Sequence, residues 1–369
     1  MKNKIHNYDF LIIGAGLIGS LTALYLQKKK FKVLVIDKNK NQISDNRTLA
    51  INANSRDFLK NLGIWTQIKN QPQEIKKILI KDNTNSKDLV FENNQESMGS
   101  VAYNKEILSI ARNTLLKKKS LITGLEIPIS KLCSEENLNI NQKAYSFKKI
   151  ILTIGKTFEE NYFLERKNFN NRHQSFVGFF DHSHDHQNIA YEIFTADGPF
   201  AVLPAPKKNK NFSTFIFSTK NNMTYLEIKR LLRHYFSKSH GNIILKKKIQ
   251  NFKISPHLSK TSNPKILLLG DTLRSIHPVA GQGWNLGVKD IEHLGYCLDL
   301  YDLESKDFNN FYFSNRHIEG SNFLGFTSLI NYLYDNQNSL NRSLIKLGFY
   351  SLNKISFLRD AFIQKAMGR

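Results

Sequence analysis

The chain has 369 residues with 53 lysines and arginines against 31 aspartates and glutamates, a formal net charge of +22 and a pI near 9.7. This length allows two or three domain-sized units. Two cysteines, Cys133 and Cys297, argue against a disulfide framework and favour a reducing compartment. No apolar run reaches the roughly 18 residues that a membrane-spanning helix needs. The lysines are scattered and no RNA-binding signature or zinc-finger spacing is present, so nucleic acid is the least favoured partner.

The first forty residues predict a nucleotide-binding unit. In chain order they contain an apolar run (10–13), three glycines (Gly14, Gly16, Gly19), a helix-spaced segment closing at 28–30, a second apolar run (33–36) and Asp37. This order is strand, glycine turn, helix, strand, acid, which is typical of dinucleotide-binding domains. Asp9 and the glycine register argue against a signal peptide. A glycine turn in an unrelated α/β fold remains the alternative.

Each part of that pattern has a physical role in holding a dinucleotide. Gly14 permits a tight turn, Gly16 allows the backbone to approach a pyrophosphate, and Gly19 allows close packing of helix and strand. The free N–H groups at the helix start attract phosphates. Asp37 is expected to accept a hydrogen bond from a ribose hydroxyl.

The next segments predict alternating helices and strands. Asn54 is expected to cap a helix whose apolar face is Phe58, Leu59 and Leu62 and which ends at Gly63. Residues 71–95 alternate apolar and polar residues, as strands of a second domain do. Further elements are expected as a strand and helix at 99–115 and strands at 122–127 and 148–154.

The second half of the chain begins strand-rich and ends helical. Strands are predicted at 176–180, 190–194, 200–203 and 212–218, then a helix at 225–236 and a buried strand at 265–269. From Asn285 onward the pattern is mostly helical. The second domain is therefore expected to be inserted twice into a discontinuous nucleotide-binding domain.

A second glycine-bearing block follows the buried strand. Gly270 and Asp271 stand at its end, where open α/β sheets bind ligands. The block His-Pro-Val-Ala-Gly-Gln-Gly-Trp-Asn-Leu-Gly (277–287) then leads into a helix. Gly281, Gly283 and Gly287 would leave room for a planar ligand, and the helix start would face the negative charge of a reduced flavin. An ordinary glycine-rich turn is the alternative interpretation.

Together these motifs resemble the FAD-dependent aromatic hydroxylases of ubiquinone biosynthesis, which are built like para-hydroxybenzoate hydroxylase. The resemblance runs from near residue 8 to residues 366–368. It is carried by the N-terminal fingerprint, 47–50 (Arg-Thr-Leu-Ala), 62–65 (Leu-Gly-Ile-Trp), 198–204 (Gly-Pro-Phe-Ala-Val-Leu-Pro), Gly270-Asp271 and the block from His277 to Asp290. It implies an α/β fold: a Rossmann-type FAD-binding domain (1–70, 96–172, 258–320), an inserted mixed β-sheet substrate domain (71–95, 173–257) and C-terminal helices (321–369).

The resemblance also implies a set of cofactor-binding positions. The adenosine half of FAD would be held by the N-terminal fingerprint, the pyrophosphate by Arg47, and the ribityl region by Asp271, while Asn104 is a less certain neighbour. The isoalloxazine ring would be surrounded by residues of the second block, with Pro278, Gly281 and Gly283 as the flavin-ring environment. No catalytic base is assigned. The full set is Gly14, Ala15, Gly16, Gly19, Asp37, Arg47, Asn104, Gly270, Asp271, Pro278, Gly281, Gly283, Asn285 and Leu286.

The activity that the resemblance implies is hydroxylation of a polyprenyl-phenol intermediate. NAD(P)H would reduce the flavin, O₂ would add at C4a to give a hydroperoxide, and its terminal oxygen would pass to the ring without any metal. One departure concerns the central Gly-Ala-Asp-Gly fingerprint, which reads Thr153-Ile154-Gly155 here, with its downstream serine and arginine lost. This puts the nicotinamide step in doubt. Two alternatives therefore remain. One is a flavoprotein dehydrogenase or reductase, and the other is a non-catalytic flavin-binding component of a biosynthetic complex.

Two apparent motifs, a P-loop and a histidine metal site, are rejected. The sequence also has no serine-hydrolase elbow and no Cys-x-x-Cys pair. Gly155-Lys156-Thr157 lacks the P-loop glycine five residues earlier, where Ile150 stands. The histidines at 182, 184 and 186 have metal-ligand spacing but are expected to form a solvated surface cluster.

The C-terminal tail, residues 341–369, combines apolar residues with six cations against one acid, Asp360. We expect either helices that pack on the FAD domain or a surface that contacts anionic lipid or a quinone-biosynthesis complex. The protein is expected in the cytoplasm, with the inner face of the membrane as a peripheral site. The hydroxylated ring position, the choice of NADH or NADPH and the oligomeric state are left open.

Overall fold

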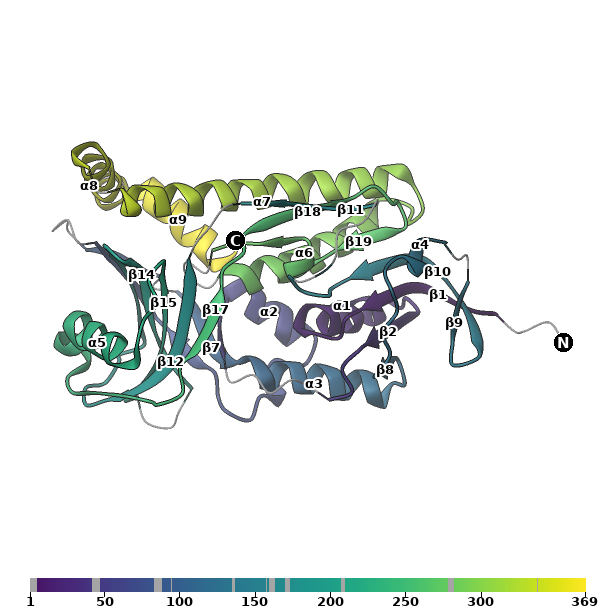
Figure 1. The fold of residues 1–369 in the computed structure, drawn as a ribbon, viewed down its shortest axis with the longest axis horizontal. Helices are drawn as coiled ribbons and strands as arrows, with labels where there is room; N and C mark the ends of the chain where they lie inside the picture. Colours follow the sequence, from purple (N-terminus) through teal and green to yellow (C-terminus); the bar gives the residue numbers. More distant parts are fainter. Residues whose placement is uncertain are drawn as a thin grey trace.

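Two large β-sheets, two small ones and the helices packed on them form the molecule, and a long helix, α7, runs along it (Figure 1). The computed structural model describes residues 5–41, 47–82, 88–93, 95–134, 137–156, 158, 163–169, 173–206, 210–277, 282–336 and 338–369. Among the described helices, none is both long enough and apolar enough to cross a bilayer.

The first sheet is the parallel sheet that the N-terminal pattern predicts. Its strand order is β19-β10-β1-β2-β8, and every neighbouring pair on this path is parallel. The bounds are β1 (Ile5–Ile13), β2 (Val33–Asp37), β8 (Leu121–Thr123), β10 (Lys143–Leu152) and β19 (Ile266–Leu268), with β9 (Leu138–Ile140) antiparallel to β10. The Rossmann-type fold class is therefore confirmed.

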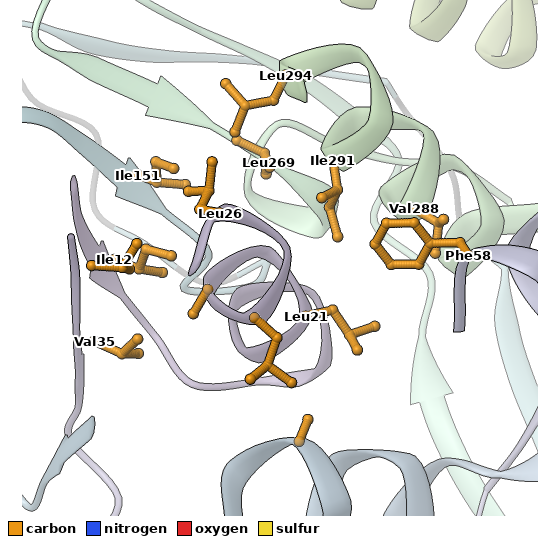
Figure 2. Packing of buried hydrophobic residues seen from close by; sticks show 14 of the residues in the cluster. Ile12, Leu21, Leu26, Val35, Phe58, Ile151, Leu269, Val288, Ile291 and Leu294 are labelled. Carbon is orange, nitrogen blue, oxygen red and sulfur yellow. The ribbon is translucent and has the colours of Figure 1, made fainter. Parts of the chain in front are cut away.

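Successive residues of these strands bury opposite faces of the sheet, as the two-residue strand period requires. Phe10 and Ile12 join the cluster beneath α1 (Leu17–Lys28), α3 (Asn104–Lys117) and α6 (Gln282–Leu300) (Figure 2). Leu11 and Ile13 join a separate cluster on the other face. Both faces being covered explains why these strands are continuous apolar runs rather than alternating ones.

The second sheet carries the strands predicted for the inserted domain. Its order is β16-β12-β15-β14-β13-β5-β6, with β17 also paired to β12. The bounds are β5 (Lys77–Asp82), β6 (Leu89–Glu92), β12 (Gln174–His182), β13 (Ile189–Thr195), β14 (Gly198–Pro204), β15 (Phe212–Thr219), β16 (Ile243–Leu245) and β17 (Gln250–Lys253). Helix α5 (Tyr225–His240) covers one face, and Thr224 and Glu227 form a capping box at its start.

Two small sheets lie beside these larger ones. One is β3 (Thr48–Asn52), β7 (Gly99–Tyr103) and β4 (Gln73–Ile75); the other is β11 (Leu164–Asn168), β18 (His257–Thr261) and β20 (Arg274–Ser275). Strand β4 lies inside the predicted substrate segment 71–95 but pairs with β7, whereas β5 and β6 join the second sheet. Short helices are η1 (Trp65–Gln67), α4 (Lys131–Ser134) and η2 (Gly270–Thr272). The domain boundaries stay a prediction.

Helix α7 (Lys306–Asp335) connects the two large sheets along the top of Figure 1. Phe308 and Tyr312 near its start are buried in the first sheet's core, and Tyr334 near its end stacks on Phe194 of β13, with ring centroids 4.5 Å apart. Helices α8 (Ser339–Lys354) and α9 (Ser356–Met367) follow and contribute Ile345, Phe349 and Ile363 to the same core as Tyr334.

One predicted helix cap is wrong by two residues. Helix α2 (Ala53–Asn61) is capped by Asn52, whose side-chain oxygen accepts the Ser55 N–H at 2.9 Å. Asn54 lies inside the first turn, and its side chain donates to Glu292 of α6 at 2.7 Å. Asparagine is a favoured N-cap residue at either position, so the local sequence does not say which one caps α2. The contact of Asn54 with Glu292 of α6 is what separates the two.

The predicted solvated histidine cluster is also wrong. His182 and His186 are 6% and 2% exposed, and only His184 is exposed to solvent. His182 lies against the ring of His240, which is 1% exposed at the end of α5, with centroids 4.7 Å apart. Burial lowers the pKa of His240 to about 3 and that of His186 to about 4.

This cluster predicts loss of stability in mild acid. The pKa of both groups is lowered in the fold, so the unfolded chain binds more protons below pH 6.5. Their contribution to the free energy of unfolding is therefore complete above pH 6.5. It decreases as the pH falls toward 4, by on the order of 3 kcal/mol for His240. Urea unfolding from pH 7 to 4 should show a smaller decrease in His240→Leu than in wild type. His234→Gln, an exposed position on the same helix, is the control; equal decreases in all three proteins would contradict the assignment.

Candidate functional site

The N-terminal glycine turn is shaped by close contact with Thr153, which follows β10. Gly14 has a φ of +102°, and a Cβ there would lie 2.5 Å from the Thr153 carbonyl oxygen. A Cβ on Gly19 would lie 2.0 Å from the Gly14 oxygen. The Thr153 hydroxyl donates to the Gly14 oxygen at 2.8 Å. Packing therefore requires glycine at both positions.

Gly16 differs from Gly14 and Gly19 because the space that a Cβ would occupy on it is open. Among the described residues, no heavy atom lies within 4 Å of the place that its Cβ would occupy. Gly16 is also the N-cap of α1, it provides no side-chain cap, and the first turn carries no acidic residue. This open helix start leaves room for an anion such as a pyrophosphate, which the first backbone N–H groups of a helix attract.

Asp37 is held in place by groups of the same turn. Its Oδ2 accepts the Ala15 N–H at 2.6 Å, and its Oδ1 accepts the Asn39 N–H at 2.7 Å. Arg112 of α3 lies 3.2 Å from Oδ2 and also donates to the Ala15 carbonyl oxygen at 2.9 Å. Both charged side chains are 8% exposed. Sequence reasoning missed Arg112, because nothing in its local pattern distinguishes it from the other helical cations.

The second glycine block contains an analogous buried acid. The Gly270 N–H donates to Oδ2 of Asp290 at 3.0 Å, and Arg274 donates to its Oδ1 at 2.7 Å. Arg316 of α7 lies 3.5 Å from the same oxygen and pairs with Glu319 at 2.6 Å. Asp290 is fully buried, so these contacts fix η2 relative to α6 and α7.

The two glycine motifs, about 250 residues apart, meet at Ile18 in the first turn of α1. A Cβ on Gly270 would lie 3.1 Å from the Ile18 side chain, and one on Gly287 would lie 2.6 Å from it. Gly287 therefore serves the packing of α6 on α1, which corrects the expectation that it makes room for a planar ligand. Gly283 does have an open side among the described residues. A small hollow is lined by Gly270, Arg274, Ile276, Gly283, Leu286, Gly287 and Asp290.

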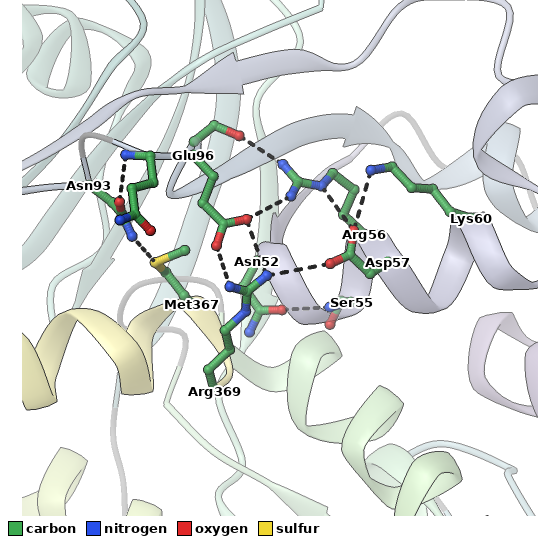
Figure 3. Close-up of polar contacts among 11 residues, drawn as sticks. Asn52, Ser55, Arg56, Asp57, Lys60, Asn93, Glu96, Met367 and Arg369 are labelled. Carbon is green, nitrogen blue, oxygen red and sulfur yellow. Dashed lines mark hydrogen bonds and ion pairs between the residues drawn. The ribbon is translucent and has the colours of Figure 1, made fainter.

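Asn285 connects the second glycine block to strand β3. Its side chain donates to the Ala50 oxygen at 2.9 Å and accepts the Asn52 N–H at 3.1 Å. Close to Asn52, Arg369 pairs with Glu96 and Asp57, as Figure 3 shows. The sequence predicted Asn285 at the flavin ring; the structure gives its side chain these two backbone partners.

The other predicted positions are distributed as follows. Asp271 is exposed, and its carbonyl oxygen accepts from His257 at 3.0 Å. Arg47 lies with its guanidinium 4.7 Å from the centre of the Phe252 ring of β17, and its carbonyl oxygen accepts the Asn104 N–H at 3.0 Å. Leu286 is buried and its carbonyl oxygen accepts from Arg274 at 3.3 Å. Pro278 and Gly281 lie outside the described residues. The roles assigned to all of these stay predictions.

The altered central fingerprint is attached to the second block. Gly155 has a φ of +83°, and its N–H donates to the Thr272 hydroxyl of η2 at 3.0 Å. Arg166 of β11 donates to the Lys156 carbonyl oxygen at 2.6 Å and lies 4.9 Å from the centre of the Phe158 ring. Arg166 therefore brings a cation to this loop.

These features fit a flavin dinucleotide. Two helices, α1 and α6, begin near each other without acidic residues in their first turns, and each has a glycine with an open side at that end. Asp37 stands at the end of β2, beside the first turn. This arrangement gives anion-attracting N–H groups for the pyrophosphate and a second helix end for a planar ring.

Comparison with known proteins agrees with this arrangement. A family model described as "FAD binding domain" matches residues 7–114 and 171–301. The ubiquinone hydroxylase UbiL of Rhodospirillum rubrum is 22% identical, over 98% of this chain and 89% of that protein. The ubiquinone biosynthesis monooxygenase COQ6 of Schizosaccharomyces pombe is 22% identical, over 96% of this chain and 90% of that one. The p-nitrophenol 4-monooxygenase PnpA of Pseudomonas putida DLL-E4 has the same fold, with a TM-score of 0.75, 14% identity and coverage of 98% and 99%.

The glycines predict separable effects of substitution. Gly19→Ala places a methyl group against the Gly14 oxygen and should destabilise the protein by about 1–3 kcal/mol, as overpacking does. Gly16→Ala has room and should leave the melting temperature of the flavin-free protein nearly unchanged while weakening FAD binding about tenfold or more. Thermal unfolding and flavin fluorescence titration measure the two effects. Gly348→Ala, an open position on α8, should change neither; unchanged FAD affinity in Gly16→Ala would contradict the assignment.

Proposed function

We propose, on the premise that this chain belongs to the FAD binding domain family, that it is an FAD-dependent monooxygenase that hydroxylates the aromatic ring of a polyprenyl-phenol intermediate in ubiquinone biosynthesis. The observation that carries the proposal is the meeting of the two glycine motifs at Ile18. The near full-length similarity to UbiL and COQ6 supports the substrate class.

In this proposal the residues of the chain bind and orient the cofactor. The first turn of α1 holds the pyrophosphate, Asp37 accepts from the adenosine ribose, and the α6 start faces the ring, where it favours negative charge. Bound FAD supplies the redox and oxygen-activating chemistry. The protein positions the phenol beside it and keeps water out.

We further propose NAD(P)H as the reductant. The loop at 153–156 carries Ile154 in place of the acidic residue of the related fingerprint, so the nicotinamide must be held by other groups. Arg166, which donates to the Lys156 carbonyl oxygen, brings a positive charge to this loop and is a candidate for that role.

Oxygen transfer tests this function directly. With FAD, a short-chain prenylated phenol and NADH or NADPH, the phenol should stimulate consumption of reductant and O₂ in equal amounts. Product formed under ¹⁸O₂ should carry one labelled atom by mass spectrometry. Turnover without O₂ uptake would instead indicate a dehydrogenase or reductase. Flavin binding without turnover would indicate a non-catalytic flavin protein.

We also propose that helices α7, α8 and α9 form a surface for an anionic membrane, where a polyprenylated substrate resides. Among the described residues, most large apolar side chains with high exposure lie on these helices or their junctions: Ile318, Phe326, Leu329, Tyr332, Leu340, Leu344, Leu347, Tyr350, Ile355, Phe357 and Leu358. Exposed cations, including Arg342, Lys346 and Lys354, lie among them. Apolar side chains interspersed with lysine and arginine are typical of interfacial helices.

Liposome flotation tests the surface. Wild type should float with vesicles containing anionic lipid at low salt, and less so at high salt, because charge attraction is screened. Phe357→Ser with Leu358→Ser should weaken the membrane partition constant about a hundredfold or more, since each apolar side chain contributes about 1.5–3 kcal/mol when buried. Leu226→Ser, which removes a 69% exposed leucine from α5, is the matched control. Equal flotation of all three proteins would contradict the proposal.

A further inference from the structure

The end of α9 lies against two asparagines at the start of α2. Gly368 follows α9 and has a φ of +84°, in the left-handed region that favours glycine. A Cβ on Gly368 would lie 2.6 Å from the side-chain nitrogen of Asn52 and 3.0 Å from the Cβ of Asn54. Met367, the residue before it, is fully buried in the core that α7 and α8 share with the second sheet. The tail is therefore packed directly on the start of α2.

Both of these asparagines are hydrogen-bonded to α6. The backbone N–H of Asn52 donates to Oδ1 of Asn285, near the start of α6, at 3.1 Å. The side chain of Asn54 donates to Oε2 of Glu292, two turns further along the same helix, at 2.7 Å. Gly368 therefore contacts the two residues that connect α2 to α6.

Ion pairs hold the next residue of the tail at the same place. The Arg369 guanidinium pairs with both carboxylate oxygens of Glu96, one of them at 3.1 Å, and lies 3.6 Å from Oδ2 of Asp57 in α2 (Figure 3). Arg56 of α2 shares Glu96, at 3.3 Å. A single exposed ion pair contributes little to stability, but a forked arginine–carboxylate contact fixes geometry. These pairs therefore set where Gly368 lies on α2.

The start of α6 depends on this support because one of its sides is open. On the α1 side, Gly287 lies against Ile18. One turn earlier, no heavy atom of the described residues lies within 4 Å of the place that a Cβ on Gly283 would occupy. Asn285 stands between these glycines and is bonded to strand β3 and to Asn52. A shift of the α2 start would therefore displace this turn of α6 on the side where the flavin ring is expected.

We propose that Gly368 and Arg369 are positioning residues for the flavin site. They hold the two asparagines at the start of α2, and these asparagines hold the start of α6. The inference rests on the proposed function, because it requires the start of α6 to face the flavin ring. Neither tail residue touches the cofactor; their effect reaches it through Asn285, whose side chain accepts the N–H of Asn52.

The test measures FAD binding by the full chain, at a temperature where every variant is folded. Gly368→Ala places a methyl group against Asn52 and should weaken FAD binding about tenfold, as the flavin fluorescence titration measures it. Arg369→Gln should weaken it about threefold, and Arg369→Lys, which keeps the charge but loses the fork, should recover part of that loss. The matched controls are Gly348→Ala on α8 and Arg233→Gln on α5, both exposed, which should leave the affinity unchanged.

A double substitution shows whether the effect passes through Asn285. Asn285→Ala alone should weaken FAD binding, and adding Gly368→Ala to it should change the affinity by less than about twofold, because the connection is already broken. The visible circular dichroism of bound FAD, which reports the surroundings of the ring, should change alike in the two single variants. A loss of global stability alone would leave both measurements unchanged while the protein is folded.

The outcomes separate this inference from the proposed function. Unchanged FAD affinity in Gly368→Ala and Arg369→Gln would overturn the inference and leave the flavin site standing. Additive effects of Gly368→Ala and Asn285→Ala would also overturn it, because the tail would then act by another route. Arg369 is 45% exposed, so Arg369→Gln combined with Asn285→Ala decides the question if Gly368→Ala does not fold. Wild type that takes up no FAD would overturn the inference and the proposed function together.

Discussion

The close approach of two distant glycine motifs around Ile18 is the constraint on which the remaining structure depends. Protein interiors are close-packed, so a Cβ at Gly287 would push α6 away from α1, and one at Gly270 would crowd η2 against Ile18. Gly14 and Gly19 make the same demand on the other side of the turn, against Thr153 and against each other. Because these contacts are satisfied together, two helix starts lie close enough to serve one dinucleotide.

Each glycine motif is fixed by a buried acid that accepts a backbone N–H of that motif and pairs with an arginine from another element. Asp37 accepts from Ala15 and pairs with Arg112; Asp290 accepts from Gly270 and pairs with Arg274. Buried ion pairs are poor contributors to net stability, but breaking one is costly. Their effect here is to specify where each backbone turn lies, which a flavin site requires more than it requires added stability.

Contacts between the two large sheets involve α7 and the residues around His277. Helix α7 begins in the core of the parallel sheet and ends against β13, and the aspartate at its end lies beside His173 of the second sheet. The ring of His173 in turn contacts that of His277 in the second glycine block. The packing of the second sheet against α7 and the second glycine block therefore sets how Asp335, His173 and His277 lie relative to one another.

The sequence by itself determined the strand–glycine–helix–strand–acid order, the twofold insertion of a strand-rich region and the helical end, because strand and helix periods and glycine spacing are local properties. It did not distinguish Asn52 from Asn54 as a helix cap, assign Gly287 to packing, find Arg112 or Arg166, or recognise that His182 and His186 are buried. Four of those features depend on a partner from another element that is distant in the sequence. The separation is 58 residues for His182–His240, 75 for Arg112–Asp37, 238 for Asn54–Glu292 and 269 for Gly287–Ile18. Such partners are chosen by how the sheets and helices pack, so only the tertiary structure decided them.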